Sequence, residues 1–235
     1  MVQQIINEVL SHSEPDRIHL FKKYFQCFPG GYGAGDEFAG IRSPLLRSLA
    51  KKYKHLSLNE VEQLLTHNIH EIRLLALHIF ELKFKSRRTT EHEKQEIVLL
   101  YLTHLDYINN WDLVDSSAHF LLGEYTLNTN KKILIDLAHS NHLWRNRVAI
   151  ITTLHHIRKN NYFTTFEIAE ILLHHPHDLI HKAVGWMLRE VGNKNLHSEL
   201  DFLKMHYKTM PRTMLRYAIE KFDEPLRLQI LKGTF

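Results

Sequence analysis

The stretch Asn109-Asn110-Trp111-Asp112-Leu113-Val114-Asp115-Ser116-Ser117-Ala118 belongs to a series of similar segments. The other members begin with a basic residue, followed by an apolar run with a small residue just inside: Arg73-Leu74-Leu75-Ala76, Arg147-Val148-Ala149, Lys182-Ala183 and Arg216-Tyr217-Ala218. Successive members lie about one two-helix repeat apart, the period typical of helical repeat proteins. The series predicts an all-α fold, a right-handed α-solenoid of antiparallel helix pairs with a concave face.

Asp115 is the exception in this series, because it is an acid where the other members have a base. Trp111 precedes it by four residues, so helical spacing puts both side chains on one side. A carboxylate beside an indole, among rows of cations, indicates a site for a positively charged reacting group within an anion-binding surface. The alternative is a structural ion pair between Asp115 and a neighbouring arginine. Asp112 falls in the first helical turn, where the helix dipole favours an acid.

Composition indicates one soluble domain spanning residues 1–235. The chain is 44% hydrophobic and 24% charged, with a net charge of +4 and a pI near 9.0, which is compatible with an anionic partner. Cys27 is the only cysteine, which excludes an intramolecular disulfide and a cysteine-rich zinc site. We find neither a signal sequence nor a long apolar run, so we expect a cytoplasmic protein that does not enter a membrane.

Helical apolar periodicity covers nearly the whole chain, interrupted by short polar breaks. The one clear irregular loop is the glycine-rich segment 29–35, and no segment alternates with period two. Helices are predicted at residues 2–12, 15–26, 44–54, 58–66, 69–84, 91–105, 110–125, 130–139, 143–159, 165–174, 178–191, 195–207, 211–222 and 224–232.

The recurring basic residues predict a cationic stripe along the concave face. Arg147 falls on the same side of its helix as Trp144, an interior-leaning place that requires a carboxylate or phosphate partner. Lys182, Trp186 and Arg189 form one stripe at helical spacing, which suits a surface that meets a ligand and its phosphates. The alternatives are solvated helix ends for the cations and an amphipathic core position for the tryptophan.

His174, His177 and His181 have the spacing of metal ligands. No H-E-x-x-H motif and no cysteine completes such a site, so we interpret them as surface histidines and expect neither metal nor cofactor. The chain also has no nucleophile-elbow, phosphate-loop or dinucleotide-binding glycine pattern.

Four motifs in this order resemble the bacterial AlkD family of DNA alkylation repair glycosylases. They are Gly40-Ile41-Arg42-x-Pro44, the stretch from Asn110 to Asp115, Trp144-Arg145-x-Arg147, and Lys182-Ala183-Val184-Gly185-Trp186-x-Leu188-Arg189-Glu190. The resemblance spans nearly the whole chain. It implies a HEAT-like repeat fold that cradles double-stranded DNA containing alkylated purines, in a monomeric enzyme acting near the bacterial nucleoid.

Family roles carry over only to matching positions. Asp115 matches the catalytic carboxylate, Trp111 and Trp186 the aromatic residues of the cleft, and Arg147 the basic member of the site. The expected DNA contacts are Arg42, Arg145, Lys182, Arg189 and Arg216. The glycine-rich segment 29–35 departs from the family pattern and makes the contacts of the first helical pair hard to transfer.

The chemistry that the family implies is hydrolysis of the glycosidic bond of N3- or N7-alkylated purines. A cationic purine departs neutral without a general acid, and a carboxylate such as Asp115 can stabilise the positive charge that develops on the deoxyribose. The resemblance implies a lesion that stays largely stacked, whereas many glycosylases flip the base. The rival functions are a catalytically silent binder of nucleic acid and a helical-repeat scaffold for a protein partner.

Overall fold

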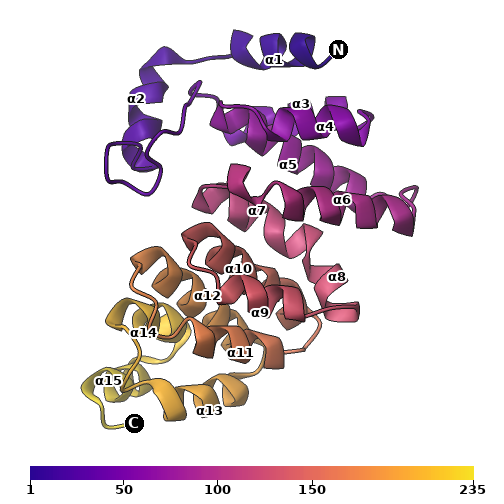
Figure 1. Cartoon of the computed structure of the whole chain (residues 1–235). Helices are drawn as coiled ribbons and strands as arrows, with labels where there is room; N and C mark the ends of the chain where they lie inside the picture. The colour runs from indigo at the N-terminus through magenta and orange to yellow at the C-terminus, as the bar shows by residue number, and fades with distance from the viewer. The chain divides into compact units, whose positions relative to one another are not determined.

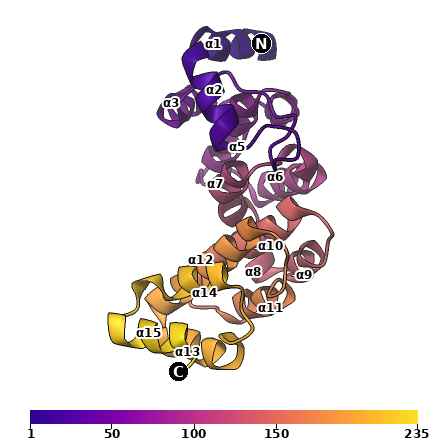
Figure 2. The same cartoon turned by 90° about the vertical axis from the view of Figure 1, so that its left-hand side faces the viewer.

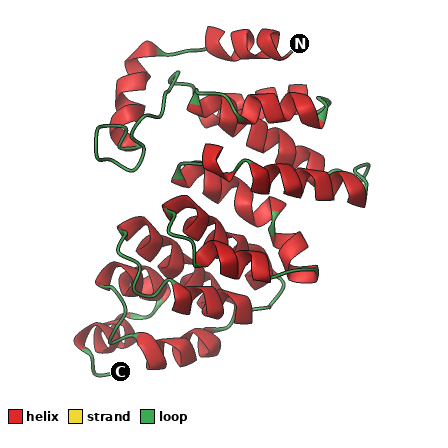
Figure 3. Ribbon diagram, viewed as in Figure 1, coloured by secondary structure: helices red, strands yellow, loops and turns green.

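The computed structural model describes residues 1–235, and its regular elements are all helical (Figures 1 and 3). The only β-type pairing is an isolated parallel bridge between Glu37 and Ile69. No helix has the combination of length and hydropathy that crossing a bilayer requires. The all-α prediction is therefore confirmed, whereas the right-handed solenoid with its concave face remains a prediction.

The chain forms two compact units, Met1–Leu121 and Leu122–Phe235. In the first unit α3, α5 and α7 lie side by side, α4 packs on α5, and α6 contacts both α5 and α7 (Figures 1 and 2). Its helices are α1 (Val2–Ser11), α2 (Pro15–Tyr24), α3 (Ser43–Tyr53), α4 (Leu58–Leu65), α5 (His70–Phe84), α6 (Glu91–Thr103), the 3₁₀ turn η1 (Leu105–Tyr107) and α7 (Trp111–Leu121).

The second unit has a similar plan. Its two longest helices, α10 and α12, pack against each other, and α14 packs on α12. The outer helices α9, α11 and α13 contact this inner row. The elements are α8 (Gly123–Asn128), α9 (Lys132–Ala138), α10 (Leu143–Arg158), α11 (Phe163–Ile171), α12 (Asp178–Lys194), α13 (Leu196–His206), α14 (Arg212–Ala218), η2 (Ile219–Lys221) and α15 (Glu224–Lys232).

Side-chain caps fix the starts of several helices. Ser57 and Glu60 form a capping box at α4, and Thr90 and Glu93 form another at α6. In the second unit His177 accepts a hydrogen bond from the Leu179 amide at the start of α12. These caps satisfy amide groups that the first helical turn leaves without partners.

The recurring segments occupy equivalent places in five helices. Asp115, Arg147, Lys182 and Arg216 are each the fifth residue of their helix, and Arg73 is the fourth residue of α5. All five helices belong to the inner rows of the two units. The repeat deduced from the sequence therefore corresponds to a structural repeat.

Two predicted helices are shorter than expected. The helix predicted at 110–125 ends at Leu121, and α8 begins at Gly123, a residue with low helix propensity. The helix predicted at 211–222 ends at Ala218 and continues as the 3₁₀ turn η2. Helix ends are where side-chain periodicity carries the least information.

α12 and α14 approach each other closely at Gly185. A Cβ atom there would overlap the Met214 carbonyl oxygen and the Tyr217 Cβ. The glycine in the Lys182–Trp186 motif is thus required by packing, because no larger residue fits without moving the α14 backbone.

Glu199 is a buried acid on α13, and burial outweighs the favourable charge of Arg189. Its side chain lies against Gly192 of α12, it is 1% exposed, and Oε1 accepts no hydrogen bond. Burial raises the pKa of this carboxyl to about 9. The folded protein therefore carries Glu199 in its neutral form at pH 7.

We predict that Glu199 makes the protein less stable as pH rises. The unfolded chain ionises this carboxyl near its ordinary pKa, whereas the folded chain holds the proton up to about pH 9, so stability is lost between these values. Glu199→Gln should have nearly wild-type stability at pH 5 and higher stability than wild type at pH 8.5, measured by urea unfolding. Exposed Glu224 supplies the control Glu224→Gln. A stability difference that does not change with pH would contradict this prediction.

Candidate functional site

α7 begins at Trp111, and aromatic packing holds this residue in place. Its ring stacks on Phe25 with centroids 5.4 Å apart and meets Tyr24 edge to face at 5.7 Å. The Trp111 amide donates a hydrogen bond of 2.9 Å to Asn110 Oδ1. Trp111 is half-buried, and part of its aromatic surface is used within the protein.

A buried histidine joins the start of α5 to the start of α7. His70 Nδ1 lies 2.8 Å from Asp36 Oδ2, and its Nε2 lies 2.8 Å from Asp112 Oδ2. We call this contact the His70 bridge. The side chains of His70 and Asp36 are only 1% and 2% exposed, whereas that of Asp112 is 18% exposed. The acid in the first turn of α7 thus has a long-range partner that local spacing does not reveal.

The charges of the His70 bridge stabilise one another. Burial disfavours a charged imidazole, but the two carboxylates outweigh it and raise the pKa of His70 to about 9. Burial likewise opposes ionisation of Asp36, whereas His70 and Arg73 lower the pKa of that carboxyl overall. His70 is therefore an imidazolium at neutral pH.

Arg73 contradicts part of the predicted cationic stripe, because it is buried and 3% exposed. Its guanidinium donates to the carboxylate of Asp36 at 2.6 Å and to Asn109 Oδ1 at 2.9 Å. It also donates to the backbone carbonyls of Tyr107, His67 and Asn68. Its donors are used inside the first unit, so Arg73 belongs to the fold and not to a DNA-binding surface.

Glu71 fixes the segment that follows the glycine-rich loop. Its buried carboxylate accepts three backbone hydrogen bonds of 2.8–3.1 Å, from Ala39, Gly40 and Ile41. Gly40 has φ +78°, and a Cβ there would overlap the Glu14 carbonyl oxygen, so glycine is required. Residues 39–41 are thereby held against the start of α5.

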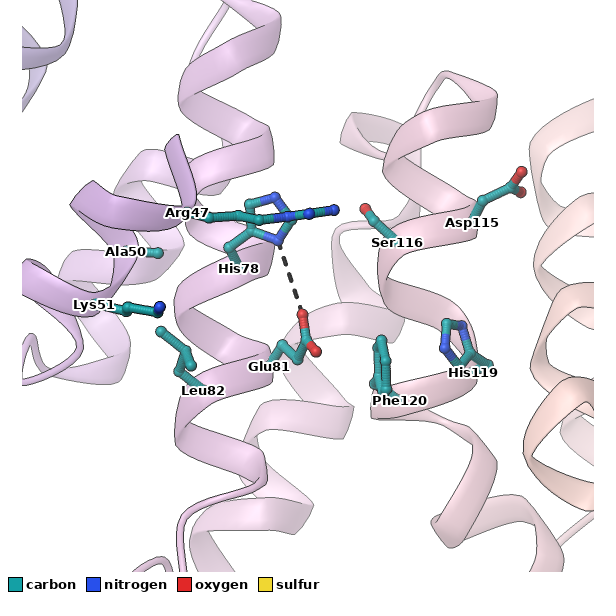
Figure 4. A pocket seen from close by; sticks show the side chains of 10 residues that line it. All are labelled: Arg47, Ala50, Lys51, His78, Glu81, Leu82, Asp115, Ser116, His119 and Phe120. Carbon is teal, nitrogen blue, oxygen red and sulfur yellow. Dashed lines mark ion pairs between the residues drawn. The ribbon is translucent and has the colours of Figure 1, made fainter. Parts of the chain in front are cut away.

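Asp115 is half-buried on α7 and lines a pocket of about 430 Å³ in the first unit. The other lining residues come from three inner helices: Arg47, Ala50 and Lys51 of α3, His78, Glu81 and Leu82 of α5, and Ser116, His119 and Phe120 of α7. Figure 4 shows the hydroxyl of Ser116 turned toward Arg47 and His78, whereas the Asp115 carboxylate points away from them. Asp115 therefore lies at the rim of a chemically mixed pocket.

Arg147 of the second unit is buried, as its interior-leaning position predicts, and is 5% exposed. Its Nη1 donates a hydrogen bond of 2.6 Å to the Leu179 carbonyl oxygen, which ties α10 to the start of α12. Arg145, two residues earlier, is half-buried. Both arginines lie in the first two turns of α10.

Lys182, Trp186 and Arg189 all lie on α12, but acidic side chains pair with both cations. Lys182 Nζ lies 2.7 Å from Asp178 Oδ2, and Arg189 pairs with Glu220. Trp186 is half-buried, and its Nε1 donates a hydrogen bond of 3.0 Å to Glu190.

The other two predicted DNA contacts lie on different elements. Arg42 is exposed at the start of α3 and lies 3.6 Å from Glu14. Arg216 is exposed on α14 and forms no ion pair. Carboxylates therefore accompany Arg42, Lys182 and Arg189, which would have to exchange these partners for phosphates.

Of the three histidines with metal-like spacing, His174 is exposed, and His177 and His181 contact the backbone. His177 caps α12, His181 hydrogen-bonds the His175 carbonyl oxygen, and burial lowers the pKa of His177. No group of three or more histidine, cysteine or acidic side chains is arranged to hold a metal ion.

The nine predicted site residues divide between the units. Arg42, Trp111 and Asp115 belong to the first, and Arg145, Arg147, Lys182, Trp186, Arg189 and Arg216 to the second. Sequence reasoning missed the His70 bridge, Arg47, Lys51 and His78. Asp36 lies 34 residues before His70, and Asp112 lies 42 residues after it, so no local motif reveals the His70 bridge.

The fold and the pocket define an all-helical protein with a carboxylate among cationic side chains. A family model described as DNA alkylation repair enzyme matches residues 5–222. The chain therefore belongs to the DNA alkylation repair enzyme family.

A solved structure supports the fold. It is a "Predicted DNA alkylation repair enzyme from Enterococcus faecalis", 17% identical to this chain with a TM-score of 0.69, and the similarity covers 91% of this chain and 98% of that one. No curated protein gives a significant sequence match.

We predict that His70 titrates with a pKa of about 9, because Asp36 and Asp112 stabilise its charged form. The raised pKa means that the bridge stabilises the fold fully below the ordinary histidine pKa of 6.5 and loses this contribution as pH rises through 9. NMR of the imidazole carbons measures this pKa, with exposed His92 as internal reference. A His70 pKa at or below 6.5 would show that the bridge does not hold a charged imidazole.

Proposed function

We propose that this protein is a DNA glycosylase that excises positively charged N3- and N7-alkylpurines from duplex DNA and so starts base excision repair. Membership of the DNA alkylation repair enzyme family supports the substrate class. The observation that carries the proposal is Asp115, a half-buried acid at the helical position where α10, α12 and α14 carry cations.

Asp115 would act on the sugar of the damaged nucleotide. Loss of a cationic purine leaves positive charge on the deoxyribose, and a carboxylate held nearby stabilises this charge and orients the attacking water. The base needs no proton, because it departs neutral. The reaction hydrolyses one C–N bond and uses one water molecule.

The remaining residues are assigned on the family resemblance. Trp111 and Trp186 would offer indole faces to a cationic nucleoside, an attraction of up to about 2 kcal/mol when desolvated. Arg147 would be the basic member of the site. Arg42, Arg145, Lys182, Arg189 and Arg216 would contact phosphates of the duplex, which position DNA without reading its sequence.

One prediction of the proposed function concerns the variant Asp115→Asn. Because the carboxylate acts on charge that develops only in the transition state, the single-turnover rate of 7-methylguanine release should fall by about 10²-fold or more, with DNA affinity nearly unchanged. Asp223→Asn, at an exposed aspartate, is the matched control and should retain the wild-type rate. Equal losses of rate and affinity in Asp115→Asn would indicate a structural ion pair. No release by the wild type would favour a silent nucleic-acid binder.

Another prediction of the proposed function concerns the charge of the lesion. Neutral bases leave as anions unless an acid protonates them, and the proposed mechanism has no such acid. Identical duplexes containing 7-methylguanine, 3-methyladenine, uracil or hypoxanthine should therefore divide into two classes, with release of the first two only. Rapid release of uracil would require a base-activating group and would overturn the mechanism.

A further inference from the structure

The pocket beside Asp115 has two cations that no carboxylate neutralises. Arg47 and Lys51 lie one turn apart on α3, both exposed and without an ion pair. Most of the predicted DNA-contacting cations described above have acidic partners, so these two differ from them. Arg47 extends over the pocket toward α7 in Figure 4.

His78 supplies a polar atom that lacks a partner. The residue is 5% exposed and lines the pocket, and its Nδ1 lies 3.8 Å from Glu81 Oε2. Its Nε2 is buried and has no hydrogen-bond partner. An imidazole N–H donates hydrogen bonds, so Nε2 can donate to an anion while Nδ1 faces Glu81.

Of the two acids that line the pocket, Asp115 points away from Arg47, and Glu81 already has cationic partners. Glu81 pairs with Lys85, and although burial opposes it, His78 and Lys85 lower the pKa of Glu81. Lys85 Nζ also lies 3.3 Å from the centroid of the Phe120 ring. The positive charges of Arg47 and Lys51 therefore remain, which disfavours a cationic base as the occupant and favours an anion.

We propose that this pocket binds one backbone phosphate of the damaged strand, next to the nucleotide on which Asp115 acts. Arg47, Lys51 and His78 Nε2 contact the phosphate oxygens. Ser116 completes the site, because its hydroxyl now makes only a 3.3 Å hydrogen bond to the Leu113 carbonyl oxygen and can exchange it for a phosphate oxygen. The inference rests on the proposed function, since it assigns the ligand as DNA.

The position of the pocket beside Asp115 explains how a phosphate bound there places the damaged nucleotide. A DNA strand carries one phosphate for about every 3.4 Å of helix axis, so the sugar of any nucleotide is flanked closely by two phosphates. Asp115 and Ser116 are consecutive residues whose side chains diverge, with the carboxylate pointing away from Arg47 (Figure 4). One phosphate held on the Ser116 side therefore places the adjoining sugar along the rim where Asp115 lies.

The test removes one phosphate charge at a time. Each duplex contains a tetrahydrofuran abasic analogue and one neutral methylphosphonate. The methylphosphonate is placed in turn at each of the three linkages on either side of the analogue. For the wild type, one linkage should stand out with a loss of affinity of about tenfold, as expected for one charge-assisted contact. In Arg47→Gln and Lys51→Gln the loss at that linkage should shrink to about twofold or less.

Matched controls use exposed cations of the same unit that lie outside the pocket. Arg87→Gln and Lys54→Gln should bind all the duplexes with the wild-type pattern. The proposal is wrong if no linkage stands out, or if the same linkage stands out equally in Arg47→Gln and Lys51→Gln. The experiment measures binding, so its result does not depend on whether the protein excises a base. Release of 7-methylguanine, measured in parallel, reports separately on the proposed glycosylase.

Discussion

The first unit depends on the charge of His70, held between Asp36 and Asp112. This bridge joins the loop after α2, the first residue of α5 and the second residue of α7. Arg73 adds a second buried cation to Asp36 and reaches Asn109, just before α7. Removal of one partner from such a cluster leaves an uncompensated buried charge, which typically costs about 3–5 kcal/mol. The cluster therefore fixes where α7 starts and in which direction it runs.

The direction of α7 determines where Trp111, Asp115 and Ser116 lie in the candidate site. Trp111 begins the helix against Phe25, Asp115 follows one turn later, and Ser116 faces the pocket that contains Arg47. The acids and bases of this unit thus have two roles. One set, centred on His70, is buried and satisfied internally. The other set lines an open pocket and retains cations for an external ligand. Asp36, which directly follows the glycine-rich segment 29–35, belongs to the first set.

Local patterns in the sequence predicted what depends on local spacing. The all-α fold, the glycine-rich loop and the recurrence of Asp115, Arg147, Lys182 and Arg216 at one helical position are confirmed. What failed depends on contacts distant in sequence. Arg73 matches the surface pattern of its equivalents, yet Asp36, 37 residues away, draws it into the core. Likewise the acid beside Arg189 was not predicted, because Glu220 lies on a different element. The acid beside Lys182 is a local partner, since Asp178 lies four residues earlier on the same helix.

The central claim is that Asp115 stabilises positive charge on the deoxyribose. Binding of a duplex with a cationic pyrrolidine in place of the damaged sugar tests it most directly, compared with a duplex carrying the neutral tetrahydrofuran ring. The wild type should bind the cationic duplex at least about 10²-fold more tightly, the lower range for transition-state analogues. Asp115→Asn should lose most of this preference while binding the neutral duplex like the wild type. An equal preference in wild type and Asp115→Asn would contradict the account.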